Sequence, residues 1–236
     1  IYVVYILLLL PAVYITFQDL PYDMNFRKNI LFNISGPLSL TFAALFCYDL
    51  KISIRRFLDV LDYMLLPITA MTIYLFFYSP DLQDVVTGAD ANFAASGGFG
   101  PNQVSTVLGI GMFVLLIRIF IPYKNRLVQL LGYVLLPLIT FRALATLSRG
   151  GVLTAILMLL FFLIVYFMFT SGQRKSQGII KIGLLFGGGF LIWLGAMIAT
   201  NGMVFNKYTN RNASGVKQES ATSGRVELAE AEFSTF

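Results

Sequence analysis

The chain has 236 residues, of which 57% are hydrophobic and only 12% are charged, and its formal net charge is +5. Soluble domains carry about 25% charged residues, so this composition excludes an ordinary water-soluble fold and is typical of an integral membrane protein. Histidine is absent and Cys47 is the only cysteine. These counts exclude an internal disulfide, His-ligated metal sites and His-based catalysis within these residues.

Seven apolar runs follow one another along the chain, and most reach the roughly 17–25 residues that cross a bilayer. They cover residues 1–17, 30–50, 57–80, 104–122, 127–147, 151–170 and 178–200. We therefore predict an all-α fold, a polytopic transmembrane helix bundle with about seven spanning helices. Residues 1–200 are expected to form this bundle, and 201–236 to begin an external, periplasmic loop region that is incomplete.

Basic residues orient the predicted bundle. They gather in loops that fall on one side: Lys51, Arg55, Arg56, Lys124, Arg126, Arg174 and Lys175. The long connection over 81–103 contains neither Lys nor Arg and falls on the other side. The positive-inside rule places the first side in the cytoplasm and the second outside, and it explains the basic charge without nucleic acid as a partner. Arg118, near the cytoplasmic end of its run, is expected to snorkel to that surface.

Two polar features mark the third run, one near its start and one after its end. Asp59 and Asp62 stand just inside it, and Arg55 precedes Asp59 by one helical turn, which favours a surface ion pair over a paired-carboxylate acid–base site. After the run, residues 96–103 read SGGFGPNQ, where glycines allow tight turns close to a ligand. The alternative for that segment is a simple loop and helix cap. Its Asn102 and Gln103 are candidate substrate-binding residues.

Two arginines lie near the predicted external side in FRALATLSRGG. Arg142 and Arg149 are seven residues apart, about two helical turns, so both are expected on one face, roughly 10 Å apart. Arg142 is expected some two turns inside the membrane, where a charge usually faces the bundle interior or a water-filled cavity. Gly150 and Gly151 are expected to make the chain reversal, and Ser148 either donates to an anion or caps the next helix.

More cations follow in the predicted external region: Lys207, Arg211, Lys217 and Arg225. Arg225 could instead pair with Glu227 and Glu230 in a structural role. Together with Arg142 and Arg149 on the same side of the membrane, however, it suggests a cradle for phosphate oxygens, since arginine binds phosphate with two parallel hydrogen bonds.

These motifs resemble the O-antigen ligase and O-antigen polymerase superfamily. The resemblance is carried by SRGG at 148–151, a further spanning helix, and then SGR at 223–225 in an external loop. The segment GGFGPNQVSTVLGIG at 97–111 is similar to the helix-opening segment of ligase-type members. The topology extends the resemblance over most of the chain, although the specific motifs occupy only about thirty residues.

The resemblance implies a metal-independent, inverting glycosyltransferase of the bacterial inner membrane, without cofactor and with its active site facing the periplasm. The donor would be a glycan on undecaprenyl pyrophosphate, and membrane lipids surround the protein. Lipid A–core is the favoured acceptor, with another glycan repeat unit or a protein Ser or Thr as alternatives. The implied catalytic residues are Arg149 and Arg225, which would hold the pyrophosphate. The expected substrate-binding residues are Arg142, Ser148, Arg211, Asn102 and Gln103.

Two points qualify this assignment. A family histidine further along the external region activates the acceptor, and this sequence has none, so we expect a fragment that lacks the catalytic-histidine region and leaves the catalytic base unassigned. The alternative class is a non-enzymatic transporter or flippase for an anionic lipid-linked polysaccharide, with the same arginines lining its cavity. Broken helices in repeated positions would favour transport, and the sequence shows no such repeat.

Overall fold

The computed structural model describes residues 2–19, 26–80, 82–88, 90–217, 230–231 and 233–234. The elements named within them are all helices, and the only bridge described outside them joins Arg211 and Lys217. The chain divides into two compact units, Ile1–Phe57 and Leu58–Phe236.

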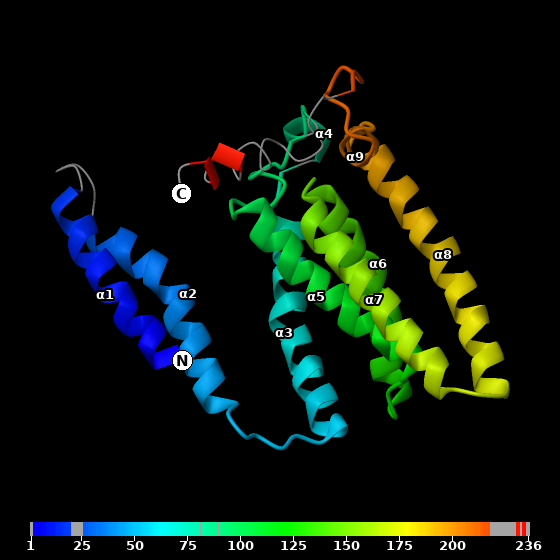
Figure 1. Cartoon of the computed structure of the whole chain (residues 1–236). Coiled ribbons are helices and arrows are strands. Elements are labelled where there is room, and N and C mark those ends of the chain that lie inside the picture. The colour runs from blue at the N-terminus through cyan, green and yellow to red at the C-terminus, as the bar shows by residue number, and fades with distance from the viewer. Residues whose placement is uncertain are drawn as a thin grey trace. The chain divides into compact units, whose positions relative to one another are not determined.

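The first unit contains α1 (Tyr2–Asp19) and α2 (Phe26–Phe46), which pack against each other (Figure 1). Both helices contain a proline, Pro11 in α1 and Pro37 in α2. Their apolar stretches, Val3–Ile15 and Ile34–Phe46, are shorter than the roughly 20 residues of a spanning helix.

The second unit holds most of the bundle. After α3 (Ile54–Tyr78), which begins at the boundary between the units, its helices are α4 (Leu82–Val85), α5 (Pro101–Phe120), α6 (Arg126–Ala145), α7 (Arg149–Phe169), α8 (Gln173–Ala199) and α9 (Met203–Tyr208). Five of the described helices, α3 and α5 to α8, are long and apolar enough to cross a membrane. The expected count of about seven is therefore not confirmed among the described residues, because the first two runs form the shorter apolar stretches of α1 and α2. The sequence did not predict α4 and α9.

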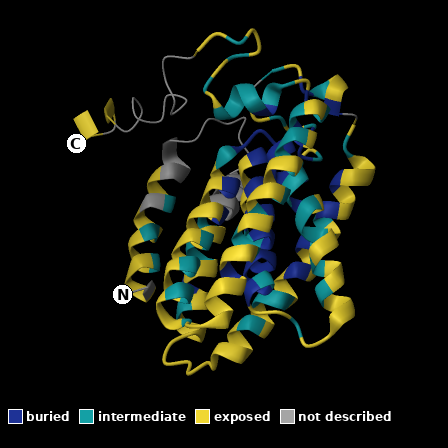
Figure 2. Cartoon of the chain, turned by 90° about the vertical axis from the view of Figure 1, so that its right-hand side faces the viewer, coloured by how far each residue is buried: buried dark blue, intermediate teal, exposed yellow. Residues whose placement is uncertain are grey.

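Helix α5 forms the centre of the second unit. It packs on α6 and α7 and carries more buried side chains than any other described helix, among them Val104, Leu108 and Val114 (Figure 2). By contrast, α7 and α8 expose large apolar side chains such as Phe161 and Phe186. An outward apolar surface of this size suits contact with lipid rather than water.

Backbone contact between α5 and α7 explains two glycines. A Cβ atom added to Gly151 would lie 1.8 Å from the carbonyl oxygen of Ser105, and one added to Gly109 would lie 2.4 Å from the carbonyl oxygen of Gly151. Small residues permit this approach, which is how many membrane helices associate. The role of Gly151 in SRGG is therefore close helix packing.

The reversal between α6 and α7 lies before the glycines, contrary to expectation. Helix α6 ends at Ala145, and Leu147 has a left-handed backbone with φ of 55° and a fully buried side chain. Gly150 and Gly151 already belong to the first turn of α7. Burial of the leucine side chain offsets the cost of a conformation that non-glycine residues rarely adopt.

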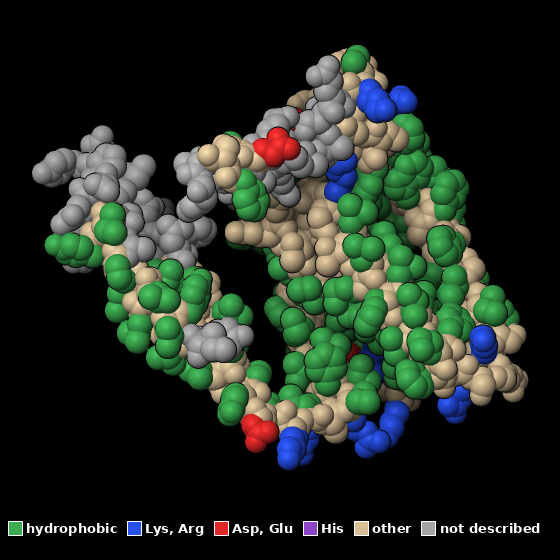
Figure 3. Space-filling model, viewed as in Figure 1, with side chains coloured by type: hydrophobic (Ala, Val, Ile, Leu, Met, Phe, Trp, Pro, Cys, Tyr) green, Lys and Arg blue, Asp and Glu red, His purple; other side chains and the backbone are tan. Residues whose placement is uncertain are grey.

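The second unit has two distinct ends. At the basic end, where α5 and α7 end and α6 and α8 begin, the exposed side chains of Lys124, Arg126, Arg174 and Lys175 gather (Figure 3). At the far end, α5 and α7 begin, α6 and α8 end, and α9 follows. The candidate site lies at the far end.

Candidate anion-binding site

Acidic residues are missing from a long part of the sequence. Residues 91–218 contain eleven Lys and Arg residues but no Asp or Glu. At the far end, Lys207 forms an ion pair of 3.5 Å with Asp90, whose side chain is almost fully exposed. Arg142 and Arg149 have no acid in the helices to which they belong. Within residues 91–218, the basic residues are thus not balanced by acids of the same segment.

A hydrogen-bond network joins the beginnings of α5 and α7. The Ser148 hydroxyl donates to Asn102 Oδ1 at 2.8 Å, and the Ser105 hydroxyl donates to the Ser148 carbonyl oxygen at 2.8 Å. The Gly151 N–H donates to Ser105 Oγ at 3.2 Å. Ser148 is buried and its side chain makes no cap bond to α7. Its proton is therefore committed to Asn102, and neither of the two expected roles of Ser148 describes this bond.

Arg149 is the first residue of α7, so it stands where a helix dipole and unpaired N–H groups favour an anion. The Ser148–Asn102 bond brings the first turn of α5 to the same place. Arg149 also lies close enough to act on Tyr208 of α9. Burial raises the pKa of Tyr208 to about 12, and the charge of Arg149 opposes that rise. Among the described residues, the buried Tyr208 hydroxyl has no hydrogen-bond partner.

Arg142 contacts α3 and is not on one helical face with Arg149, because α6 ends between them. It lies in the last turn of α6, nearer the helix end than expected. Its Nη2 donates to the Leu75 carbonyl oxygen, and its guanidinium lies 4.4 Å from the centre of the Phe76 ring. The residue is only 5% exposed, and its Nε and Nη1 have no acceptor within the described part of the chain.

The other expected site residues are dispersed. Gln103 is exposed beside Asn102 in the first turn of α5. Arg211 is exposed, and its guanidinium lies 5.8 Å from the ring centre of Phe205. Arg225 lies outside the described residues. The structure therefore joins Asn102, Ser148 and Arg149 at one place, and adds Tyr208, for which no sequence motif gave a signal.

A second polar cluster lies towards the basic end. Arg118 is buried and donates from Nε to Asp62 Oδ1 at 2.9 Å and from Nη2 to Asp62 Oδ2. Tyr123 donates to the same carboxylate at 2.7 Å. Burial raises the pKa of Tyr123, and the hydrogen bond to Asp62 acts in the same direction.

This cluster corrects two expectations from the sequence. Arg118 does not snorkel to the surface, because it pairs with Asp62, which is 56 positions away in the chain. The expected surface pair of Arg55 with Asp59 is not among the ion pairs of the described residues.

Comparisons with known proteins add no assignment, since no family model, curated protein or solved structure matches the chain.

Proposed function

We propose that the protein transfers a glycan from undecaprenyl pyrophosphate to an acceptor hydroxyl at the outer face of the bacterial inner membrane, with lipid A–core as the favoured acceptor. The observation that carries the proposal is the position of Arg149, which begins α7 beside the first turn of α5 at the end of the bundle opposite the basic end. By the positive-inside rule this far end is external, where a lipid-linked donor presents its pyrophosphate.

The chemistry requires stabilisation of a leaving group. The acceptor oxygen attacks the anomeric carbon from the face opposite the pyrophosphate, the glycosidic carbon–oxygen bond breaks, and undecaprenyl pyrophosphate leaves with the bonding electrons. The acceptor proton passes to a base that the described residues do not identify. A guanidinium and helix N–H groups already fixed at the phosphate oxygens stabilise the developing charge without reorganisation. Arginine stays protonated at all accessible pH and can do this as a planar fork.

Two neighbouring groups support the same role. The Asn102 side chain is exposed, and its amide nitrogen remains a donor after Oδ1 accepts from Ser148. The Tyr208 phenol, with a pKa of about 12, stays neutral and is therefore a hydrogen-bond donor near Arg149. Apart from these two groups, Arg142 lies against α3 and keeps two buried donors that lack acceptors among the described residues. Buried donors of this kind require an acceptor, such as a phosphate oxygen or a bound water.

The test is a transfer assay with the full-length protein in nanodiscs, an undecaprenyl pyrophosphate-linked oligosaccharide and purified lipid A–core. Both the glycosylated acceptor and the released undecaprenyl pyrophosphate are measured. Arg149→Ala should lower the transfer rate about 100-fold or more, the usual effect of removing one donor to a developing anion. Arg149→Lys keeps the charge but loses the fork, so its rate should fall between those of the alanine variant and the wild type.

Arg174→Ala is the matched control, because Arg174 is an exposed arginine at the basic end. It should transfer at the wild-type rate. Wild-type activity in Arg149→Ala would refute the assigned site. A transporter or flippase would move the donor across a liposome membrane without releasing undecaprenyl pyrophosphate, and that result would replace the enzyme by the alternative class. Glycan chains that lengthen in the absence of lipid A–core would identify a polymerase.

A further inference from the structure

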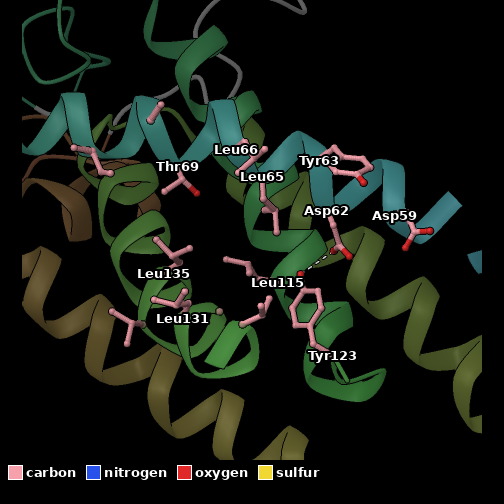
Figure 4. Close-up of a pocket in the computed structure, with 15 residues that line it drawn as sticks. Asp59, Asp62, Tyr63, Leu65, Leu66, Thr69, Leu115, Tyr123, Leu131 and Leu135 are labelled. Atoms are coloured by element: carbon pink, nitrogen blue, oxygen red, sulfur yellow. Dashed lines mark hydrogen bonds between the residues drawn. The ribbon is translucent and has the colours of Figure 1, made fainter. Parts of the chain in front are cut away.

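An apolar groove lies between α3, α5 and α6, towards the basic end. Its volume is about 750 Å³, which is within the roughly 300–1,000 Å³ of ligand pockets. Figure 4 shows Leu131 and Leu135 of α6 facing Leu65 and Thr69 of α3 across the groove. The groove is open at its side, and several lining residues, such as Leu66 and Leu131, are exposed apolar side chains.

Contacts between α3 and the rest of the bundle flank the groove. Near the basic end, Asp62 binds Arg118 and Tyr123. Towards the far end, Phe76 stacks on Phe141 with ring centres 6.1 Å apart, and Arg142 donates to the carbonyl oxygen of Leu75. Between these contacts the helices leave a space. Leaving this space empty in a bilayer would be costly, because the side chains that line it would lose dispersion contacts. A flexible apolar chain is the natural filling.

The length of the groove suits a lipid chain. Its lining residues on α3 run from Asp59 to Ile73, which at 1.5 Å per residue is about 21 Å along the helix. The hydrocarbon core of a bilayer is about 30 Å thick, so the groove extends somewhat beyond one leaflet. An acyl chain that enters from the leaflet at the basic end can lie along it.

The polar mouth of the groove selects the headgroup. Asp59 lines the mouth, is exposed, and has no ion pair in the described part of the chain, whereas the charge of Asp62 is balanced by Arg118. A carboxylate repels an anionic headgroup and binds an ammonium. Lys124 follows the lining residue Tyr123 in the chain and offers a positive charge to a phosphate. A zwitterionic headgroup with a primary ammonium complements both charges.

We propose that this groove binds one aminophospholipid, such as phosphatidylethanolamine, from the leaflet at the basic end, with an acyl chain between α3 and α6 and its ammonium at Asp59. The site is distinct from the glycan-transfer site at the far end and does not depend on the function proposed there. The bound lipid would fill the space between α3 and α6.

Native mass spectrometry of the full-length protein, released from nanodiscs of equal phosphatidylethanolamine and phosphatidylglycerol content, tests the site. The wild type should retain one phosphatidylethanolamine in preference to phosphatidylglycerol. Asp59→Asn should lower that preference about two- to fivefold, the effect of an exposed ion pair. Asp84→Asn, at an exposed acid of α4, is the matched control and should leave the preference unchanged.

A second variant tests the groove itself. Ala70 is an exposed lining residue, so Ala70→Trp should fill the groove from the lipid side without disturbing the core, and it should abolish retention of the lipid. Three results would overturn the proposal: an equal preference in Asp59→Asn and wild type, a preference for phosphatidylglycerol, or unchanged lipid retention in Ala70→Trp. Wild-type protein that retains no phosphatidylethanolamine would overturn it as well.

Discussion

Gly150 and Gly151 are adjacent in the first turn of α7, yet they stand in opposite surroundings. A Cβ on Gly150 meets nothing within 4 Å, whereas a Cβ on Gly151 would lie 1.8 Å from the Ser105 carbonyl oxygen. Ordinary van der Waals contact begins at 3.4 Å, so the alanine at 151 falls about 1.6 Å short of the space that it needs. The obstacle is the backbone of α5, the most buried helix, and not a movable side chain.

The pair of variants separates this clash from helix propensity. Replacing Gly by Ala favours a helix by up to about 1 kcal/mol, and both variants gain that term. Overpacking costs typically about 1–3 kcal/mol, so Gly151→Ala should be less stable than Gly150→Ala by about 2 kcal/mol or more. For a chain of this size that difference corresponds to a Tm lower by roughly 4–8 °C.

Thermal unfolding in detergent, followed by tryptophan fluorescence, measures the difference. The only tryptophan, Trp193, packs against Phe205 with ring centres 6.1 Å apart, so its emission reports on the loss of packing at the far end. Gly109→Ala, with 2.4 Å to the backbone of α7, should also lower the Tm. Equal Tm values for Gly150→Ala and Gly151→Ala would refute backbone contact between α5 and α7.

Two further predictions concern polar groups inside the bundle. Arg118→Met leaves the Asp62 carboxylate without its main partner and should destabilise the protein by about 3 kcal/mol in chemical unfolding. Arg118→Met combined with Asp62→Leu should recover most of that loss. A double variant as unstable as the single one would contradict the pairing. Tyr208→Phe removes a buried hydroxyl that lacks a partner in the described region and should leave the Tm at pH 7 unchanged within about 2 °C. A tyrosine in the unfolded chain loses its proton near pH 10, whereas folded Tyr208 loses its proton near pH 12. The wild type should therefore lose stability as the pH rises from about 10 to about 12, and Tyr208→Phe should lose less. Equal losses in the two proteins would show that Tyr208 is not buried.

The sequence was sufficient for properties that depend on local composition. Apolar length predicted the helices α3 and α5 to α8, since a bilayer requires about 20 apolar residues in one run. Pro101 begins α5, a position that suits proline because its missing N–H would have no partner in the first turn of the helix.

Contacts between distant residues were not predictable in this way. Arg118 looked like a snorkelling residue because only its distance from the helix end was visible, whereas its pairing with Asp62 depends on how α3 packs on α5. The left-handed backbone of Leu147 could not be predicted from the local sequence. The nearby glycines are the residues that normally adopt this conformation, and what stabilises it at Leu147 is burial of the side chain in the folded bundle. The contact of Ser148 with Asn102 likewise depends on the close approach that Gly151 permits.

The Arg118–Asp62 pair also has a consequence for how the protein is made. Helix α3 leaves the ribosome before α5, so Asp62 reaches the membrane without its cationic partner, and Arg118 follows in a later helix. A single charge at the centre of a spanning helix raises the insertion free energy by about 2.5–3.5 kcal/mol, and less near the interface. Each helix therefore enters the bilayer less readily alone than together with the other. This favours an insertion route in which α3 waits beside the translocon until α5 emerges and the two charges enter as a neutral pair.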